Sequence, residues 1–123
     1  MQEKIKHIEA NGVKYPLVFN LNVMEKIQDK YETIENWGDL TEEKTKEDGT
    51  KQEVNLKALK YGILEMINEG IDIENESRED KREFITDKQV GRIITGLGLE
   101  KMAKSIQNTV MESTRIDDNL KNE

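Results

Sequence analysis

The chain contains no cysteine, one histidine, one proline and few aromatic residues, which make up 5% of it. Without cysteine it forms no disulfide and no thiolate metal site. The single His7 excludes a cluster of imidazole ligands and any site that needs two histidines. From these absences we expect no metal site and no cofactor.

Long apolar segments are also missing. No run approaches the length of a transmembrane helix, and the first ten residues, MQEKIKHIEA, lack the apolar core of a signal peptide. Hydrophobic residues make up 34% of the chain and charged residues 37%. We therefore expect a soluble protein of a reducing compartment, without a membrane partner, whose apolar residues are confined to a few faces.

Acidic side chains outnumber basic ones. The net charge is −7, and residues 86–123 carry equal numbers of basic and acidic side chains, so the excess of acid lies in residues 1–85. Nucleic-acid binding is driven by the release of counterions to a cationic surface, so this balance argues against a nucleic-acid partner. A length of 123 residues fits one domain with a modest core.

The N-terminal residues predict a β-hairpin. Asn11 and Gly12 form the preferred loop of a type I′ turn, because both positions need positive φ. This turn places Glu9 opposite Lys14 and His7 opposite Pro16 on one face, which we expect to be polar, with Pro16 at a strand edge. The other face then collects Ile8, Ala10, Val13, Tyr15 and Leu17.

Helical spacing of apolar residues recurs through the rest of the chain. Either Asn20 or Asn22 caps the first helix, and Asn22 has the spacing of a capping box. Thr33 starts the turn at 33–40, Asn55 caps the helix at 55–70, and Thr86 begins a second capping box. The fold class is mainly α (α+β): a short N-terminal β-hairpin followed by a small bundle of about four to five helices. The expected segments are a turn at 33–40, polar loops at 41–53 and 71–83, helices at 55–70, 87–95 and 99–113, a single domain at 1–113 and a flexible tail at 114–123.

Residues for catalysis are not evident. The carboxylate pairs Glu25/Asp29 and Glu65/Glu69 adjoin no Ser, Cys or His nucleophile, and solvated helix faces explain them. Residues 72–80 lack the glycine and the final glutamate of a calcium loop, and ITGLGLEK lacks the rest of a phosphate-binding loop. We expect no catalytic residue and no enzymatic activity.

Residues 87–112 allow a helix-turn-helix interpretation, since a glycine turn separates two short helices. Lys101, Lys104 and Gln107 would then face a groove of DNA. Glu100 and Glu112 on the same helix oppose this interpretation, and pairs of helices joined by glycine turns are common packing units.

Large apolar side chains on helices either fill a core or bind a partner helix. We expect Met24 and Met66 to lie in the core and Met111 to be exposed. Trp37 suits a structural role or an interface anchor, since tryptophan is enriched at binding hot spots. On side-chain character alone, the candidate partner-binding residues are Trp37, Leu40, Met102, Ile106, Val110 and Met111.

The order of these segments resembles the tail assembly chaperones of long-tailed phages and prophages of Gram-positive bacteria. The resemblance extends over most of residues 5–112 and is one of order and character, without a short diagnostic motif. It is carried by Tyr15-Pro16-Leu17, Phe19-Asn20, Met24-Glu25-Lys26-Ile27-Gln28, Tyr31, Trp37 and the helix at 56–70.

The resemblance implies a non-enzymatic protein that binds and solubilises the tape-measure protein and helps tail-tube assembly. Its implied partners are the tape-measure protein, the tail-tube protein and a second copy of the chain, in the cytoplasm of the bacterial host and outside the mature virion. Two alternatives stay open at this point. They are a prophage DNA-binding regulator, acting through residues 87–112, and a structural tail-completion protein.

Overall fold

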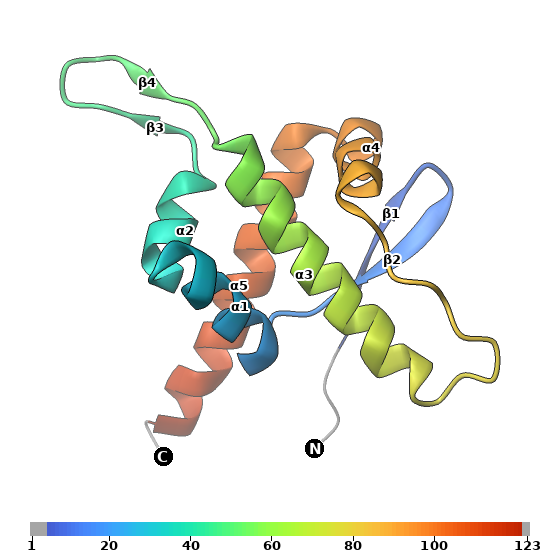
Figure 1. Ribbon diagram of the computed structural model, residues 1–123. Coiled ribbons are helices and arrows are strands. Elements are labelled where there is room, and N and C mark those ends of the chain that lie inside the picture. The colour runs from blue at the N-terminus through green and yellow to red at the C-terminus, as the bar shows by residue number, and fades with distance from the viewer. Residues whose placement is uncertain (1–4, 122–123) are drawn as a thin grey trace.

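The computed structural model describes residues 5–121, with side chains described for residues 5–113. This part of the chain forms two small antiparallel hairpins and five helices (Figure 1). The expected fold class is confirmed. In chain order the elements are β1 (Lys6–Ala10), β2 (Val13–Leu17), α1 (Leu21–Tyr31), α2 (Ile34–Leu40), β3 (Lys44–Thr45), β4 (Lys51–Gln52), α3 (Leu56–Asn75), α4 (Asp87–Leu97) and α5 (Leu99–Lys121).

The N-terminal hairpin has the predicted register, with Glu9 opposite Lys14 and His7 opposite Pro16. Asn11 and Gly12 have φ angles of 55° and 77°, as a type I′ turn requires. The Asn11 side chain donates to the Arg92 carbonyl oxygen at 3.3 Å, so the turn is also anchored on α4.

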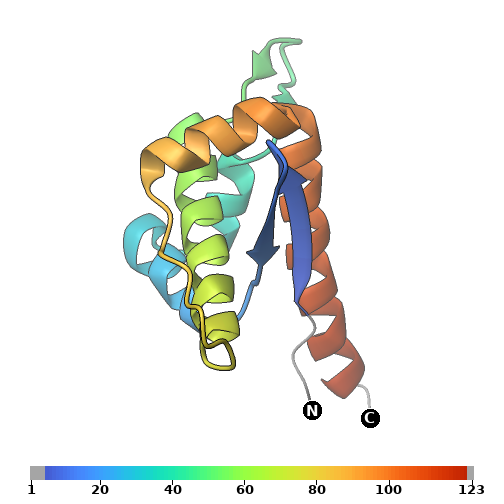
Figure 2. The same cartoon turned by 90° about the vertical axis from the view of Figure 1, so that its right-hand side faces the viewer.

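The hairpin lies between α3 and α5, so both of its faces have helical neighbours (Figure 2). The prediction of a polar face is wrong at Pro16, which is buried against α3: a Cβ on Gly70 would lie 2.7 Å from the Pro16 Cβ. On the opposite face, Val13 is 41% exposed beside the turn. His7 remains exposed, and its Nε2 lies 2.7 Å from Glu74 Oε2.

Helix α3 is the centre of the molecule. It begins at the predicted cap, Asn55, whose side chain accepts from Ala58 N at 3.0 Å. The predicted end at Gly70 is wrong: Gly70 lies inside the helix, where the missing side chain lets Pro16 approach. Its buried residues are Ala58, Leu59, Gly62, Ile63, Met66, Ile67, Gly70 and Ile71.

Three other helix starts follow the capping rules. Asn20, and not Asn22 with its capping-box spacing, caps α1 by accepting from Val23 N at 3.2 Å. Thr33 caps α2, and Thr86 with Gln89 forms the predicted capping box of α4. Met66 is buried as expected, whereas Met24 is partly buried at the edge of the core.

The two polar segments differ from the expected loops. Within residues 41–53 the strands β3 and β4 pair around a turn with Gly49 at φ 87°, and this hairpin extends away from the helices (Figure 1). Of residues 71–83, the first five continue α3. Residues 76–86 then run back along α3 to α4, and this segment is called the strap below.

Helix α5 is longer than the predicted range of 99–113, because its backbone continues as helix to Lys121. Of the predicted flexible tail at 114–123, residues 122–123 lie outside the described residues. Lys6 Nζ lies 2.9 Å from Glu112 Oε1 and joins β1 to α5. Among the described residues, no helix combines the length and the apolar character needed to cross a membrane.

Candidate partner-binding site

A groove of about 140 Å³ lies between α2 and α5 and is called the α2–α5 groove. Two segments far apart in the sequence form it. It is lined by Trp37, Gly38, Thr41, Glu42, Ile106, Gln107, Val110 and Met111. Four of the six candidate partner-binding residues are therefore brought together at one place.

The six candidates differ in their exposure. Trp37 and Ile106 are 1% exposed and form the floor of the α2–α5 groove, whereas Met111 is 55% exposed at its rim. Val110 is partly buried and lines the groove. The remaining two candidates, Leu40 and Met102, pack in or against the core and do not line this groove.

Trp37 is fixed by contacts on several sides. Its indole Nε1 donates to the Ala58 carbonyl oxygen at 2.9 Å. The ring lies against Gly62, where a Cβ would collide with it, and stacks on Phe19 with the centroids 6.2 Å apart. This side chain belongs to the core, and it forms the base on which a bound apolar group would rest.

Polar groups border the α2–α5 groove. The Thr41 hydroxyl donates to the Gly38 carbonyl oxygen at 2.9 Å, which satisfies it within the turn after α2. Ser113 Oγ lies 3.1 Å from the carbonyl oxygens of Phe19 and Thr109, so it ties α5 to the chain that follows β2. The groove thus has an apolar floor between two fixed walls.

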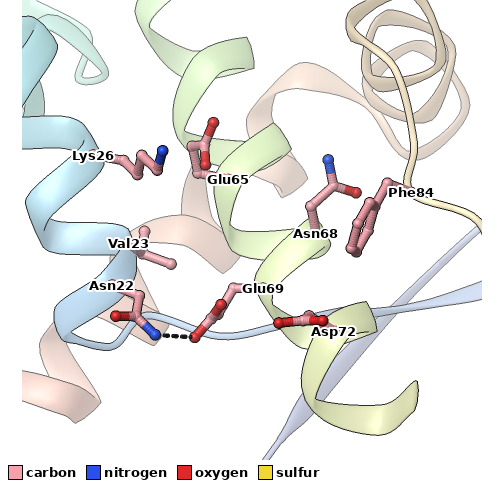
Figure 3. Close-up of a pocket in the computed structure, with 8 residues that line it drawn as sticks. All are labelled: Asn22, Val23, Lys26, Glu65, Asn68, Glu69, Asp72 and Phe84. Atoms are coloured by element: carbon pink, nitrogen blue, oxygen red, sulfur yellow. Dashed lines mark hydrogen bonds between the residues drawn. The ribbon is translucent and has the colours of Figure 1, made fainter. Parts of the chain in front are cut away.

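A second groove, of about 160 Å³, lies between α1 and α3 and is called the α1–α3 groove (Figure 3). Most of its lining is polar. Its residues are Asn22, Val23 and Lys26 from α1, Glu65, Asn68, Glu69 and Asp72 from α3, and Phe84 from the strap.

Side-chain amides of α3 hold the strap in place. Asn68 donates to the Ile85 carbonyl oxygen at 3.2 Å and accepts from Ile85 N at 2.9 Å. Asn75 makes the same pair of bonds with Arg82, at 2.9 and 3.0 Å. Each asparagine therefore binds the strap as a neighbouring strand would, on either side of Phe84.

The Tyr61 phenol, which contacts α1, has carboxylates among its neighbours. Burial raises the pKa of the Tyr61 phenol above its ordinary value of 10.0, and the carboxylates of Glu65 and Asp29 raise it further. The Tyr61 hydroxyl donates to the Lys26 carbonyl oxygen at 3.1 Å, and burial also raises the pKa of Tyr31, whose ring packs edge-on against Tyr61. Lys30 Nζ lies 4.4 Å from the centre of the Tyr61 ring, in a cation–π contact.

The residues considered for DNA binding lie in different environments. Helices α4 and α5 are joined at Gly98, with φ 102°. Lys101 and Lys104 are exposed, whereas Gln107 lines the α2–α5 groove. Within residues 5–113, no three His, Cys, Asp or Glu side chains are grouped so that they could hold a metal ion.

Sequence reasoning missed the residues that build the α1–α3 groove. Asn68 and Asn75 carry a signal, since they are seven residues apart on the polar side of one helix and face a polar segment. Phe84 carries none, because an isolated phenylalanine in a charged segment is equally consistent with burial. Comparison with protein-family models, curated proteins and solved structures gives no match for this chain.

Proposed function

We propose that this protein is a phage tail assembly chaperone, which binds and solubilises the tape-measure protein and helps tail-tube assembly. The order of sequence segments supports the family and the partner. The observation that supports binding is the α2–α5 groove, with Met111 exposed beside the buried floor of Trp37 and Ile106. An apolar side chain of a helical partner would cover Met111 and rest on that floor.

The charges around the groove suit a protein that keeps an apolar partner in solution. Glu42 lines the α2–α5 groove, and Glu112 lies next to Met111 in the chain. A net charge of −7 opposes association between complexes once the apolar surface is covered. The proposed action is binding alone, without catalysis, in the cytoplasm of the bacterial host and with the protein absent from the mature virion.

Co-expression with the tape-measure protein tests this proposal. The tape-measure protein should be soluble and should co-purify with this chain, and it should precipitate when expressed alone or with an unrelated acidic protein. The tail-tube protein and self-association are tested in the same preparation, by adding the tube subunit and by measuring the mass of the complex. Failure to bind or to solubilise the tape-measure protein would refute the proposal.

A further inference from the structure

The outer face of α3 forms the floor of the α1–α3 groove, with α1 on one side and Phe84 on the other (Figure 3). Val23 is buried on the α1 side, and Glu65 and Asp72 lie on the same side of α3, two helical turns apart. The groove therefore combines an apolar wall with a row of carboxylates. It shares no lining residue with the α2–α5 groove.

Phe84 is held at the surface by its neighbours. Its side chain is 57% exposed, although a phenyl group is stabilised by burial. The four hydrogen bonds from Asn68 and Asn75 fix the backbone of Ile85 and Arg82 on either side of it. Arg82 Nη1 also donates to the Lys14 carbonyl oxygen at 3.1 Å, so the strap is attached to the hairpin as well.

The carboxylates of the groove differ in their partners. Glu69 Oε2 accepts from Asn20 at 2.7 Å and from Asn22 at 2.9 Å, which makes it a structural link between α1 and α3. Glu65 and Asp72 make no side-chain hydrogen bond or ion pair with any described residue. Lys26 supplies the single positive charge among the lining residues, against three negative ones.

We propose that the α1–α3 groove binds a cationic amphipathic segment of a protein partner, whose apolar residues pack on Phe84 and whose Lys or Arg side chains pair with Glu65 and Asp72. Charge complementarity selects this occupant. An acidic or neutral apolar segment would cover these carboxylates without offering them a partner of opposite charge, which is unfavourable. The inference concerns a different surface from the proposed chaperone site and does not depend on the identity of the tape-measure protein.

A binding experiment with a defined probe tests the inference. The probe is a fluorescently labelled amphipathic helical peptide of Leu and Lys, with a Leu and Glu peptide of the same pattern as its control. The Lys peptide should bind, the Glu peptide should not, and the amide signals that move in an NMR titration should lie in α1, α3 and the strap. Binding should weaken as salt is added.

Two variants and two matched controls localise the binding. Phe84→Ser and the double variant Glu65→Gln/Asp72→Asn should each weaken peptide affinity about tenfold or more. Leu56→Ser alters a side chain that is 55% exposed outside both grooves, and Glu47→Gln/Glu100→Gln makes the same change in charge elsewhere. These controls should change the affinity less than about twofold.

Other results would overturn the inference. If the two double variants weakened the peptide affinity equally, the peptide would be attracted by the net charge of the protein alone. NMR shifts confined to the α2–α5 groove would show that the peptide binds at the other groove. Binding of the Glu peptide with equal affinity would show that the carboxylates do not select a cationic ligand. Thermal unfolding of each variant shows whether its fold is intact, and Phe84→Ser should leave the melting temperature nearly unchanged because its side chain is exposed.

Discussion

The two grooves on this protein are built in opposite ways. The floor of the α2–α5 groove is part of the core, since Trp37 and Ile106 are 1% exposed. The α1–α3 groove is polar, and its apolar wall, Phe84, is 57% exposed on a strap held by asparagine side chains. In the first groove the same side chains stabilise the fold and face a ligand, whereas in the second the two roles belong to different residues.

The largest expected effect follows from truncating the floor of the α2–α5 groove. Trp37→Ala should lower the free energy of unfolding by about 3–5 kcal/mol, because it removes a buried indole and leaves a cavity. Urea titration measures the change. Leu56→Ala, at a side chain 55% exposed, should change it by less than about 0.5 kcal/mol. Similar losses for both variants would contradict the assignment of Trp37 to the core.

A smaller effect is expected from adding a methyl group at Gly62, where the Trp37 indole already lies. Gly62→Ala places a methyl group against the Trp37 ring, and overpacking of this kind costs about 1–3 kcal/mol. That loss should exceed the gain in helix propensity, which is about 1 kcal/mol. At Gly91 the nearest atom to an added Cβ is Lys60 Nζ at 3.7 Å, so Gly91→Ala should stabilise the protein. Calorimetry compares the stabilities of the Gly62→Ala and Gly91→Ala variants. A stabilised Gly62→Ala variant would refute the close contact between Gly62 and Trp37.

Removing one anchor of the strap tests the other groove. Asn68→Ala deletes both hydrogen bonds to Ile85 and should lower the free energy of unfolding by about 1–2 kcal/mol. Hydrogen exchange of the Ile85 amide should become faster, while exchange in the centre of α3 changes little. An unchanged Ile85 amide would mean that the asparagine does not hold the strap.

The smallest effect concerns the charge of the α1–α3 groove. The pKa of Tyr61 is raised above 10.0, by burial first and then by Glu65 and Asp29, so Glu65→Gln should lower it. Because the folded protein holds this proton more tightly than the unfolded chain, the stability linked to Tyr61 is present below pH 10 and lost as the pH rises. Ultraviolet titration of the phenol should show a lower midpoint in Glu65→Gln. A higher midpoint would show that Glu65 does not raise the pKa of Tyr61.

Local signals in the sequence were sufficient for several elements. The Asn11-Gly12 turn predicted the hairpin register, and Asn55 and Thr86 marked helix starts correctly, because a turn or a cap depends on a few adjacent residues. The sequence left Asn20 and Asn22 as alternative caps of α1, since both have suitable side chains; in the structure Asn20 is the cap, and both donate to Glu69.

Features that depend on distant contacts were not predictable. A glycine that follows an apolar helical stripe is typical of a helix end, yet Gly70 lies inside α3, where Pro16 packs against it. The strap follows α3 because Asn68 and Asn75 bind its backbone, and nothing within residues 76–86 indicates that path. For the candidate site, side-chain character selected Trp37, Ile106, Val110 and Met111, which share a groove, but it did not distinguish the buried floor from the exposed rim.

We propose above that the α2–α5 groove binds the tape-measure protein. The most direct test of this proposal is co-expression of the tape-measure protein with Met111→Glu and, in parallel, with Leu56→Glu. Both side chains are 55% exposed, so the two variants carry the same change at equal exposure, and only Met111 lines the groove. We predict that Met111→Glu loses the soluble tape-measure protein while Leu56→Glu retains it. Equal solubilisation by the two folded variants would contradict the account.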